Sequence, residues 1–179
     1  MTLPPHYRKI YLGFIKFACW MVFFGLIAGI LFQESSKKVP FEKFPPGIHW
    51  ESIVYLALLH GHIFLIGVLI PIAVLAMLQF GLILEGKIVS ERVLKWGGCL
   101  YKWGALLTVL LMLYKGYHFV ISVRMGQTDF AAIEHNYFGG ILPLRAAAYG
   151  ISHTAMAVGL IVLVIGILRS LPKAAQTQN

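Results

Sequence analysis

Residues 52–84 read SIVYLALLHGHIFLIGVLIPIAVLAMLQFGLIL, an apolar run without a single Asp, Glu, Lys or Arg. A helix needs about 20 predominantly apolar residues to cross the hydrocarbon core of a bilayer, so this run predicts a transmembrane helix. Three further runs, at about 10–32, 93–123 and 146–171, meet the same requirement. The sequence therefore predicts an all-α integral membrane protein, an up-down-up-down four-helix bundle that forms a single domain over residues 1–179.

The composition agrees with a membrane protein. Hydrophobic residues make up 59% of the chain and charged residues 12%, whereas a soluble domain carries about 25% charged residues. The net charge of +8 does not indicate a nucleic-acid partner, because the basic residues flank the apolar runs instead of lining one polar face. The lipid bilayer is the expected partner. Pro71 is expected to kink its helix, and residues 173–179 are expected to form a disordered tail.

Lys and Arg in the connections predict the orientation of the spans. One side of the predicted bundle holds Arg8, Lys9, Lys87, Arg92, Lys95, Arg169 and Lys173, and the other holds Lys37, Lys38, Lys43, Arg124 and Arg145. The first side has the larger basic count, so we expect both termini in the cytoplasm.

Four of the seven histidines lie inside predicted spans: His60, His62, His118 and His153. Ionisable residues at membrane depth are costly and point to function. His60 follows Glu51 by nine residues and His153 follows Arg145 by eight, which puts both roughly 12–14 Å below the outer connections. Two imidazoles at one level on different helices suit bis-histidine ligation of a haem iron.

His60 and His62 cannot point at the same centre, because residues two apart on a helix differ by about 200° in direction. His60 shares its face with Gly67 and Pro71, which leave room for a planar ligand, so we favour His60. His62 is left to bond a haem propionate, a neighbouring helix or a second ligand. His118, roughly 9 Å deep, is open to a cofactor role or to a hydrogen bond between helices.

Two arginines flank the same level. Guanidinium groups pair strongly with carboxylates such as haem propionates, although interfacial snorkelling accounts for them equally well. The candidate cofactor-binding residues are His60, His153, His62, His118, Arg124 and Arg145, with His60 and His153 as the metal ligands. No residue is assigned a catalytic role.

The spacing around two histidines carries a family resemblance. His60 is followed eleven residues later by Pro71-Ile72, and His153 six residues later by Gly159. Both segments resemble the low-spin haem site on the second and tenth helices of the catalytic subunit of haem–copper oxidases. The resemblance implies that His60 and His153 are axial ligands of one haem b. The chain departs from that family because it has four helices instead of about twelve and lacks the residues for a copper centre, so we do not expect oxygen reduction.

Two shorter features extend the comparison. The pattern HxHxxxxG at residues 60–67 and the stretch GLIAGILFQESSK at residues 25–37 resemble a class of small, uncharacterised four-helix proteins of the bacterial inner membrane. This resemblance implies a multi-pass protein of the bacterial inner (cytoplasmic) membrane and no established activity.

We therefore expect a membrane-bound b-type cytochrome that transfers electrons near the periplasmic face. It would serve as a subunit or accessory of a respiratory complex instead of a stand-alone enzyme, with a redox protein or quinol and other membrane subunits as partners. Two alternatives stay open. One is a non-redox structural or assembly subunit whose histidines join helices, and the other is a copper-binding membrane module that uses His60 or His62 with His118.

Overall fold

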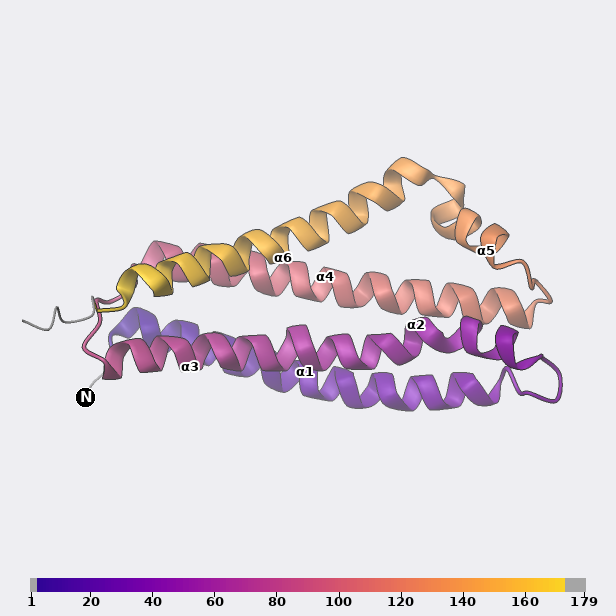
Figure 1. The fold of residues 1–179 in the computed structure, drawn as a ribbon, viewed down its shortest axis with the longest axis horizontal. Helices are drawn as coiled ribbons and strands as arrows, with labels where there is room; N and C mark the ends of the chain where they lie inside the picture. The colour runs from indigo at the N-terminus through magenta and orange to yellow at the C-terminus, as the bar shows by residue number, and fades with distance from the viewer. Residues whose placement is uncertain (1–2, 173–179) are drawn as a thin grey trace, which may run out of the picture.

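The computed structural model describes residues 3–172, and every regular element within them is helical. The elements are α1 (Pro5–Lys37), α2 (Pro46–Phe64), the π-helical turn η1 (Leu65–Leu69), α3 (Ile70–Ile83), α4 (Glu91–Arg124), α5 (Phe130–Asn136), the 3-10 turn η2 (Tyr137–Gly140) and α6 (Leu142–Ser170). Four helical spans, namely α1, α2 through α3, α4 and α6, are long and apolar enough to cross a membrane, and successive spans alternate in direction (Figure 1). The all-α, multi-pass membrane prediction is confirmed. The predicted disordered tail lies outside the described residues.

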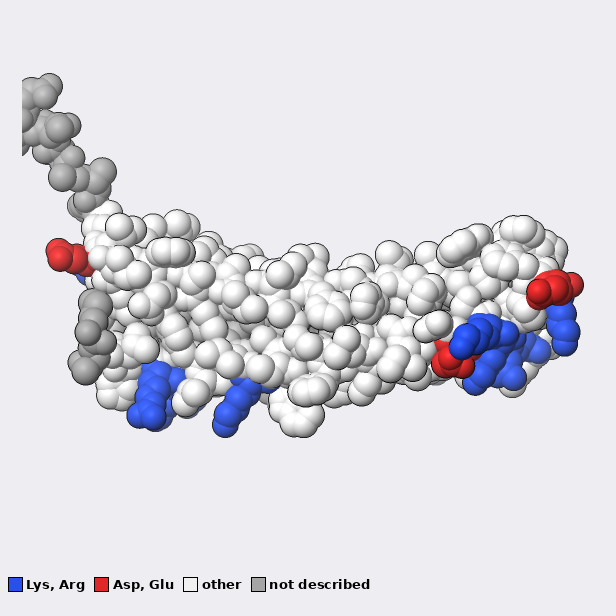
Figure 2. Space-filling view, turned by 90° about the horizontal axis from the view of Figure 1, so that it is seen from below, with Lys and Arg blue, Asp and Glu red and all other residues white. Residues whose placement is uncertain are grey.

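Two ends of the bundle can be distinguished. The terminal end carries Pro5, the connection at 84–90 and Ser170, and the loop end carries the connections at 38–45 and 125–141 (Figure 1). The terminal end is joined by main-chain groups, since the Lys87 amide donates to the Ser170 carbonyl at 2.7 Å. The charged side chains in the view of Figure 2 lie toward the two ends, with an uncharged middle. This distribution suits a bilayer around the middle of the bundle.

The helices extend beyond the apolar runs that predicted them. α1 begins at Pro5 and ends at Lys37, and α2 begins at Pro46, so helix replaces most of the expected first loop. Proline suits the first turn of a helix because its missing amide would have no intrahelical acceptor there. Polar residues at the interface continue a helix as well as apolar ones, so an apolar run marks the hydrocarbon core and not the helix end.

The second span contains a π-bulge next to the expected kink at Pro71. The Ile70 amide bonds to the Leu65 carbonyl, five residues back, which leaves the Ile66 carbonyl without its usual partner. Tyr101, fully buried on α4, donates its hydroxyl to that carbonyl at 2.5 Å. An unsatisfied backbone group is costly in lipid, so this bond allows the span to keep both the bulge and the proline.

α4 and α6 approach each other closely through glycines. A Cβ atom added at Gly104 would lie 2.3 Å from the Met156 nitrogen, and one at Gly159 would lie 2.3 Å from the Tyr101 nitrogen. Small residues allow backbones to meet in a membrane, where lipid provides no hydrophobic drive for helices to associate. This contact joins the last span to the rest of the bundle.

α6 leaves the bundle toward the loop end. It packs along α4 and contacts α3 near the terminal end, but it has little contact with α2. In Figure 1 its first half rises away from the other spans, and α5 and η2 lie beneath it. In the loop-end half, α2, which carries His60 and His62, therefore has little contact with α6, which carries His153.

Substitution of Gly159 tests the contact between α4 and α6. The added methyl of Gly159→Ala forces the backbones apart, so we expect a loss of about 1–3 kcal/mol in the free energy of unfolding. Gly150→Ala, on the same helix with no atom within 4 Å of its Cβ, should instead add roughly 0.5–1 kcal/mol. Circular dichroism during unfolding in one detergent compares the two variants, and equal stability would contradict the packing.

The hydrogen bond to the π-bulge gives a second prediction. Tyr101→Phe leaves the Ile66 carbonyl without its partner, and we expect it to cost about 1–3 kcal/mol of stability. Tyr117→Phe is the matched control on α4, because the Tyr117 hydroxyl makes no hydrogen bond within residues 3–172. Unfolding of both variants in detergent measures the difference in their stability. A Tyr101→Phe protein as stable as the control would contradict a stabilising role for this hydrogen bond.

Candidate functional site

His60 lies on the side of α2 that faces α1. A Cβ at Gly29 of α1 would lie 3.5 Å from its Cδ2 atom, and the ring of Phe64 meets it edge-on at 5.1 Å between ring centres. The side chain is exposed, and no hydrogen bond within residues 3–172 engages its ring nitrogens. Both ring nitrogens of His60, the histidine that the sequence analysis favours as a ligand, are therefore available to bind a cofactor.

His62 and His153 share a different arrangement. The Nδ1 atom of His62 lies 2.8 Å from the Leu58 carbonyl, and that of His153 lies 2.9 Å from the Tyr149 carbonyl. A carbonyl oxygen only accepts, so in both rings Nδ1 carries the proton and Nε2 is the free nitrogen. Metal-bound histidines commonly show this pattern, because the bond at one nitrogen orients the other toward the metal.

His118 makes its contact through the other nitrogen. Its Nε2 atom donates to the Ile133 carbonyl of α5 at 2.9 Å, which ties α5 to α4. The ring also packs against Tyr137 of η2, with 5.4 Å between ring centres. This histidine has a clear structural role at the loop end.

Two tyrosines connect His118 to His153. Tyr137 donates to the Leu111 carbonyl at 3.1 Å, and its hydroxyl lies 3.1 Å from that of Tyr149. The Tyr149 ring in turn stacks on His153 at 6.0 Å. Burial raises the pKa of Tyr137 far above its ordinary value, and the bond to Tyr149 adds to this effect, so the hydroxyl stays protonated. We call His118, Tyr137, Tyr149 and His153 the aromatic row.

A charged cluster lies beside the aromatic row. Glu134 of α5 pairs with Lys115 of α4 at 2.9 Å and with Arg145 of α6 at 3.1 Å, and the Arg145 guanidinium also donates to the Glu134 carbonyl at 2.9 Å. The Lys115 ammonium lies 4.3 Å from the centre of the Tyr55 ring. Arg145, a candidate propionate partner, thus has a carboxylate partner already. Arg124 is exposed at the last turn of α4.

The structure brings some of the predicted residues together and separates others. His118 and His153 belong to one row of contacts, whereas His60 lies against α1 and contacts neither. Among residues 3–172, no three His, Cys, Asp or Glu side chains are grouped so as to hold a metal ion. Tyr149 lies four residues before His153, on the same face of α6, so the spacing could have indicated it. Tyr137 and Glu134 had no such signal, because their positions depend on how the third connection folds.

Comparison with known proteins places the chain in a family. Residues 13–170, which include most of the first span, the other three spans and every candidate histidine, match the model described as protein of unknown function, DUF2871. The chain belongs to the DUF2871 family. No curated protein and no solved structure is similar to it. The DUF2871 family carries no described activity, so the haem assignments remain predictions from the residues and from the haem–copper oxidase resemblance.

Removing the central carboxylate tests the charged cluster of this DUF2871 protein. Glu134→Gln leaves Lys115 and Arg145 without a counter-charge, and because all three side chains are partly exposed we expect a cost of only roughly 1 kcal/mol. The effect should be local, with faster amide hydrogen exchange over residues 130–145. Glu42→Gln, a carboxylate in the first connection, is the control. Unchanged exchange in Glu134→Gln would show that the cluster does not hold this segment.

Proposed function

We propose that this DUF2871 protein is a membrane-bound b-type cytochrome that transfers electrons at the loop end of its bundle. The observation that carries the proposal is the state of His153. Its Nδ1 atom is held by the Tyr149 carbonyl at 2.9 Å, its Nε2 atom is free, and it lies on the span that diverges from α2. A histidine oriented in this way would suit a ligand of the haem iron.

Two features of α2 and α6 support the proposal. His60 and His153 are both exposed, so each ring is accessible from outside the bundle. The divergence of α6 keeps its first half clear of α2. The haem would supply one-electron chemistry, while the protein would hold the iron and exclude water.

Two histidines of α2 compete for the role of ligand. The spacing to Pro71-Ile72 favours His60, with its unengaged ring. The hydrogen bond from His62 to the Leu58 carbonyl favours His62, because it leaves Nε2 as the free nitrogen. We keep His60 as the proposed ligand and assign His62 to a hydrogen bond with the cofactor.

The surroundings bear on how the cofactor would be held. Arg145 and Arg124 lie at the loop end, and each can pair with a propionate carboxylate. Arg145 would then share its charge between a propionate and Glu134. The electron partner is a redox protein or a quinol, and other membrane subunits of a respiratory complex are proposed neighbours. The proposed location is the bacterial inner membrane, with both termini in the cytoplasm.

A structural or assembly role is the second candidate function. The observation that favours it is the bond from His118 of α4 to the Ile133 carbonyl of α5, which is a helix-joining contact of the expected kind. A copper-binding module is the third, and no group of three ligating side chains within residues 3–172 supports it.

Visible spectroscopy separates these functions. We expect the protein, produced with a haem precursor and purified in detergent, to show sharp visible absorption bands after reduction with dithionite. His153→Ala and His60→Ala should abolish these absorption bands, because each would remove a proposed ligand of the haem iron, and His62→Ala should only shift the bands. His135→Ala, an exposed histidine of the loop end, is the control. Loss of the bands in His62→Ala with retention in His60→Ala would reassign the ligand on α2.

Two results would overturn the proposal that the protein is a cytochrome. A colourless protein that holds stoichiometric copper would favour the copper module, and one that holds neither haem nor copper would favour the structural role. Metal analysis of the same preparation distinguishes them.

A further inference from the structure

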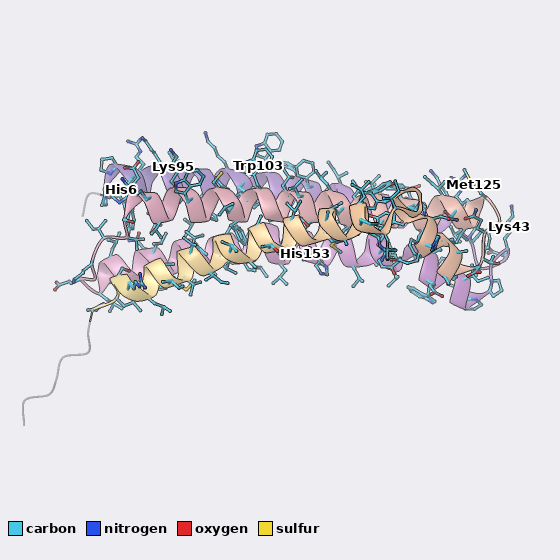
Figure 3. All side chains as sticks on the ribbon, turned by 90° about the horizontal axis from the view of Figure 1, so that it is seen from above. His6, Lys43, Lys95, Trp103, Met125 and His153 are labelled. Atoms are coloured by element: carbon cyan, nitrogen blue, oxygen red, sulfur yellow. The ribbon has the colours of Figure 1, made fainter. Side chains whose placement is uncertain are left out.

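A cavity of about 590 Å³ lies between α1 and α4 in the terminal half of the bundle, away from the candidate haem residues. The two helices run in the same direction (Figure 1). They meet at Gly98, where an added Cβ would lie 2.8 Å from the Ile10 Cδ1 atom. In Figure 3 three of the lining residues, His6, Lys95 and Trp103, follow one another along one edge of the molecule, starting from the terminal end. The cavity therefore runs from the membrane–water interface at the terminal end toward the interior of the bilayer.

The charges of this cavity are mostly positive. Lys9, Lys95 and Lys102 line it, against a single carboxylate, Glu91. The Lys102 ammonium, on a residue well inside α4, would lie 3.3 Å from a Cβ at Gly13 and lies 5.6 Å from the centre of the Phe14 ring. Three ammonium groups thus border one cavity between two spans. Such a basic cleft attracts an anion at the membrane surface.

The deeper wall of the cavity is apolar. Phe17 of α1 and Trp103 and Leu106 of α4 line it, farther along their helices than the lysines. Trp103 is 60% exposed, so this wall continues into the surface that faces lipid. A ligand that fits must combine an anionic group with a long apolar portion.

We propose that the cavity between α1 and α4 binds one anionic phospholipid. Its phosphate is held by Lys9, Lys95 and Lys102, and an acyl chain lies along Phe17, Trp103 and Leu106. The cavity is within the usual size range of small-molecule sites, about 300–1,000 Å³. A free anion would use the lysines but not the apolar wall, and a neutral lipid would use the wall but not the lysines.

Thermal unfolding in detergent tests the site with defined additives. Phosphatidylglycerol should raise the Tm of the unmodified chain by roughly 5 °C or more, because a ligand that binds only the folded state stabilises it. Phosphatidylcholine with the same acyl chains, and inorganic phosphate alone, should each raise it by much less. The response to phosphatidylglycerol should be lost in the triple variant Lys9→Gln, Lys95→Gln, Lys102→Gln. It should persist in the control Lys37→Gln, Lys38→Gln, Lys43→Gln, which removes as much charge at the loop end.

Several outcomes would overturn the proposal. Equal stabilisation by phosphatidylcholine would mean that the headgroup charge is not recognised, and equal stabilisation by inorganic phosphate would mean a simple anion site. Stabilisation by a short-chain quinone in place of phosphatidylglycerol would identify a quinone site. If the triple variant does not fold, the single variants Lys9→Gln and Lys95→Gln replace it, and an undiminished response in both would reject the site. None of these measurements depends on bound haem.

Discussion

The close contact between α4 and α6 is the constraint on which the rest of the structure depends. Gly104 and Gly159 allow the two backbones to meet where any side chain would separate them. A lipid solvent gives apolar helices no reason to associate, so such contacts determine which helices pair. The end of α6 is held a second time, by the bond between Ser170 and Lys87. Because both restraints act in the terminal and middle parts of α6, its first turns are free to diverge from the bundle, whereas His153 follows Ser152, whose carbonyl packs at Gly104.

The second span meets a different constraint, the need to satisfy every backbone group within the bilayer. Pro71 supplies no amide hydrogen, and the π-bulge before it leaves the Ile66 carbonyl without a backbone donor. The Tyr101 hydroxyl donates to this carbonyl instead. The bulge also changes the rotation of the helix between α2 and α3, because a π-turn takes more residues per turn than an α-turn. The directions of His60 and His62 relative to the other spans therefore depend on a bond made by α4. A local sequence feature and a distant tyrosine jointly determine where the histidines point.

The difference between what the sequence predicted and what it missed follows from these constraints. The four spans were predictable because the length and polarity of a run are local properties. The position of a histidine along its helix was predictable for the same reason, since the rise per residue is constant. Its direction around the helix was not, because the bulge at 65–69 and the divergence of α6 depend on contacts between spans. The cluster around Glu134 was missed because the third connection, expected as a loop, folds into α5 and η2 and carries this carboxylate to Lys115 and Arg145.

The bonding of the histidines bears on the choice between a cytochrome and a structural subunit. A histidine that serves only to join helices bonds to another element, as His118 does with the Ile133 carbonyl. His62 and His153 instead bond to carbonyls four residues back on their own helices. Such a bond adds nothing to the association of spans, yet it fixes the ring and its tautomer. Metal-bound histidines usually make a bond of this kind, because it orients the other nitrogen toward the metal, and it therefore supports the proposed cytochrome.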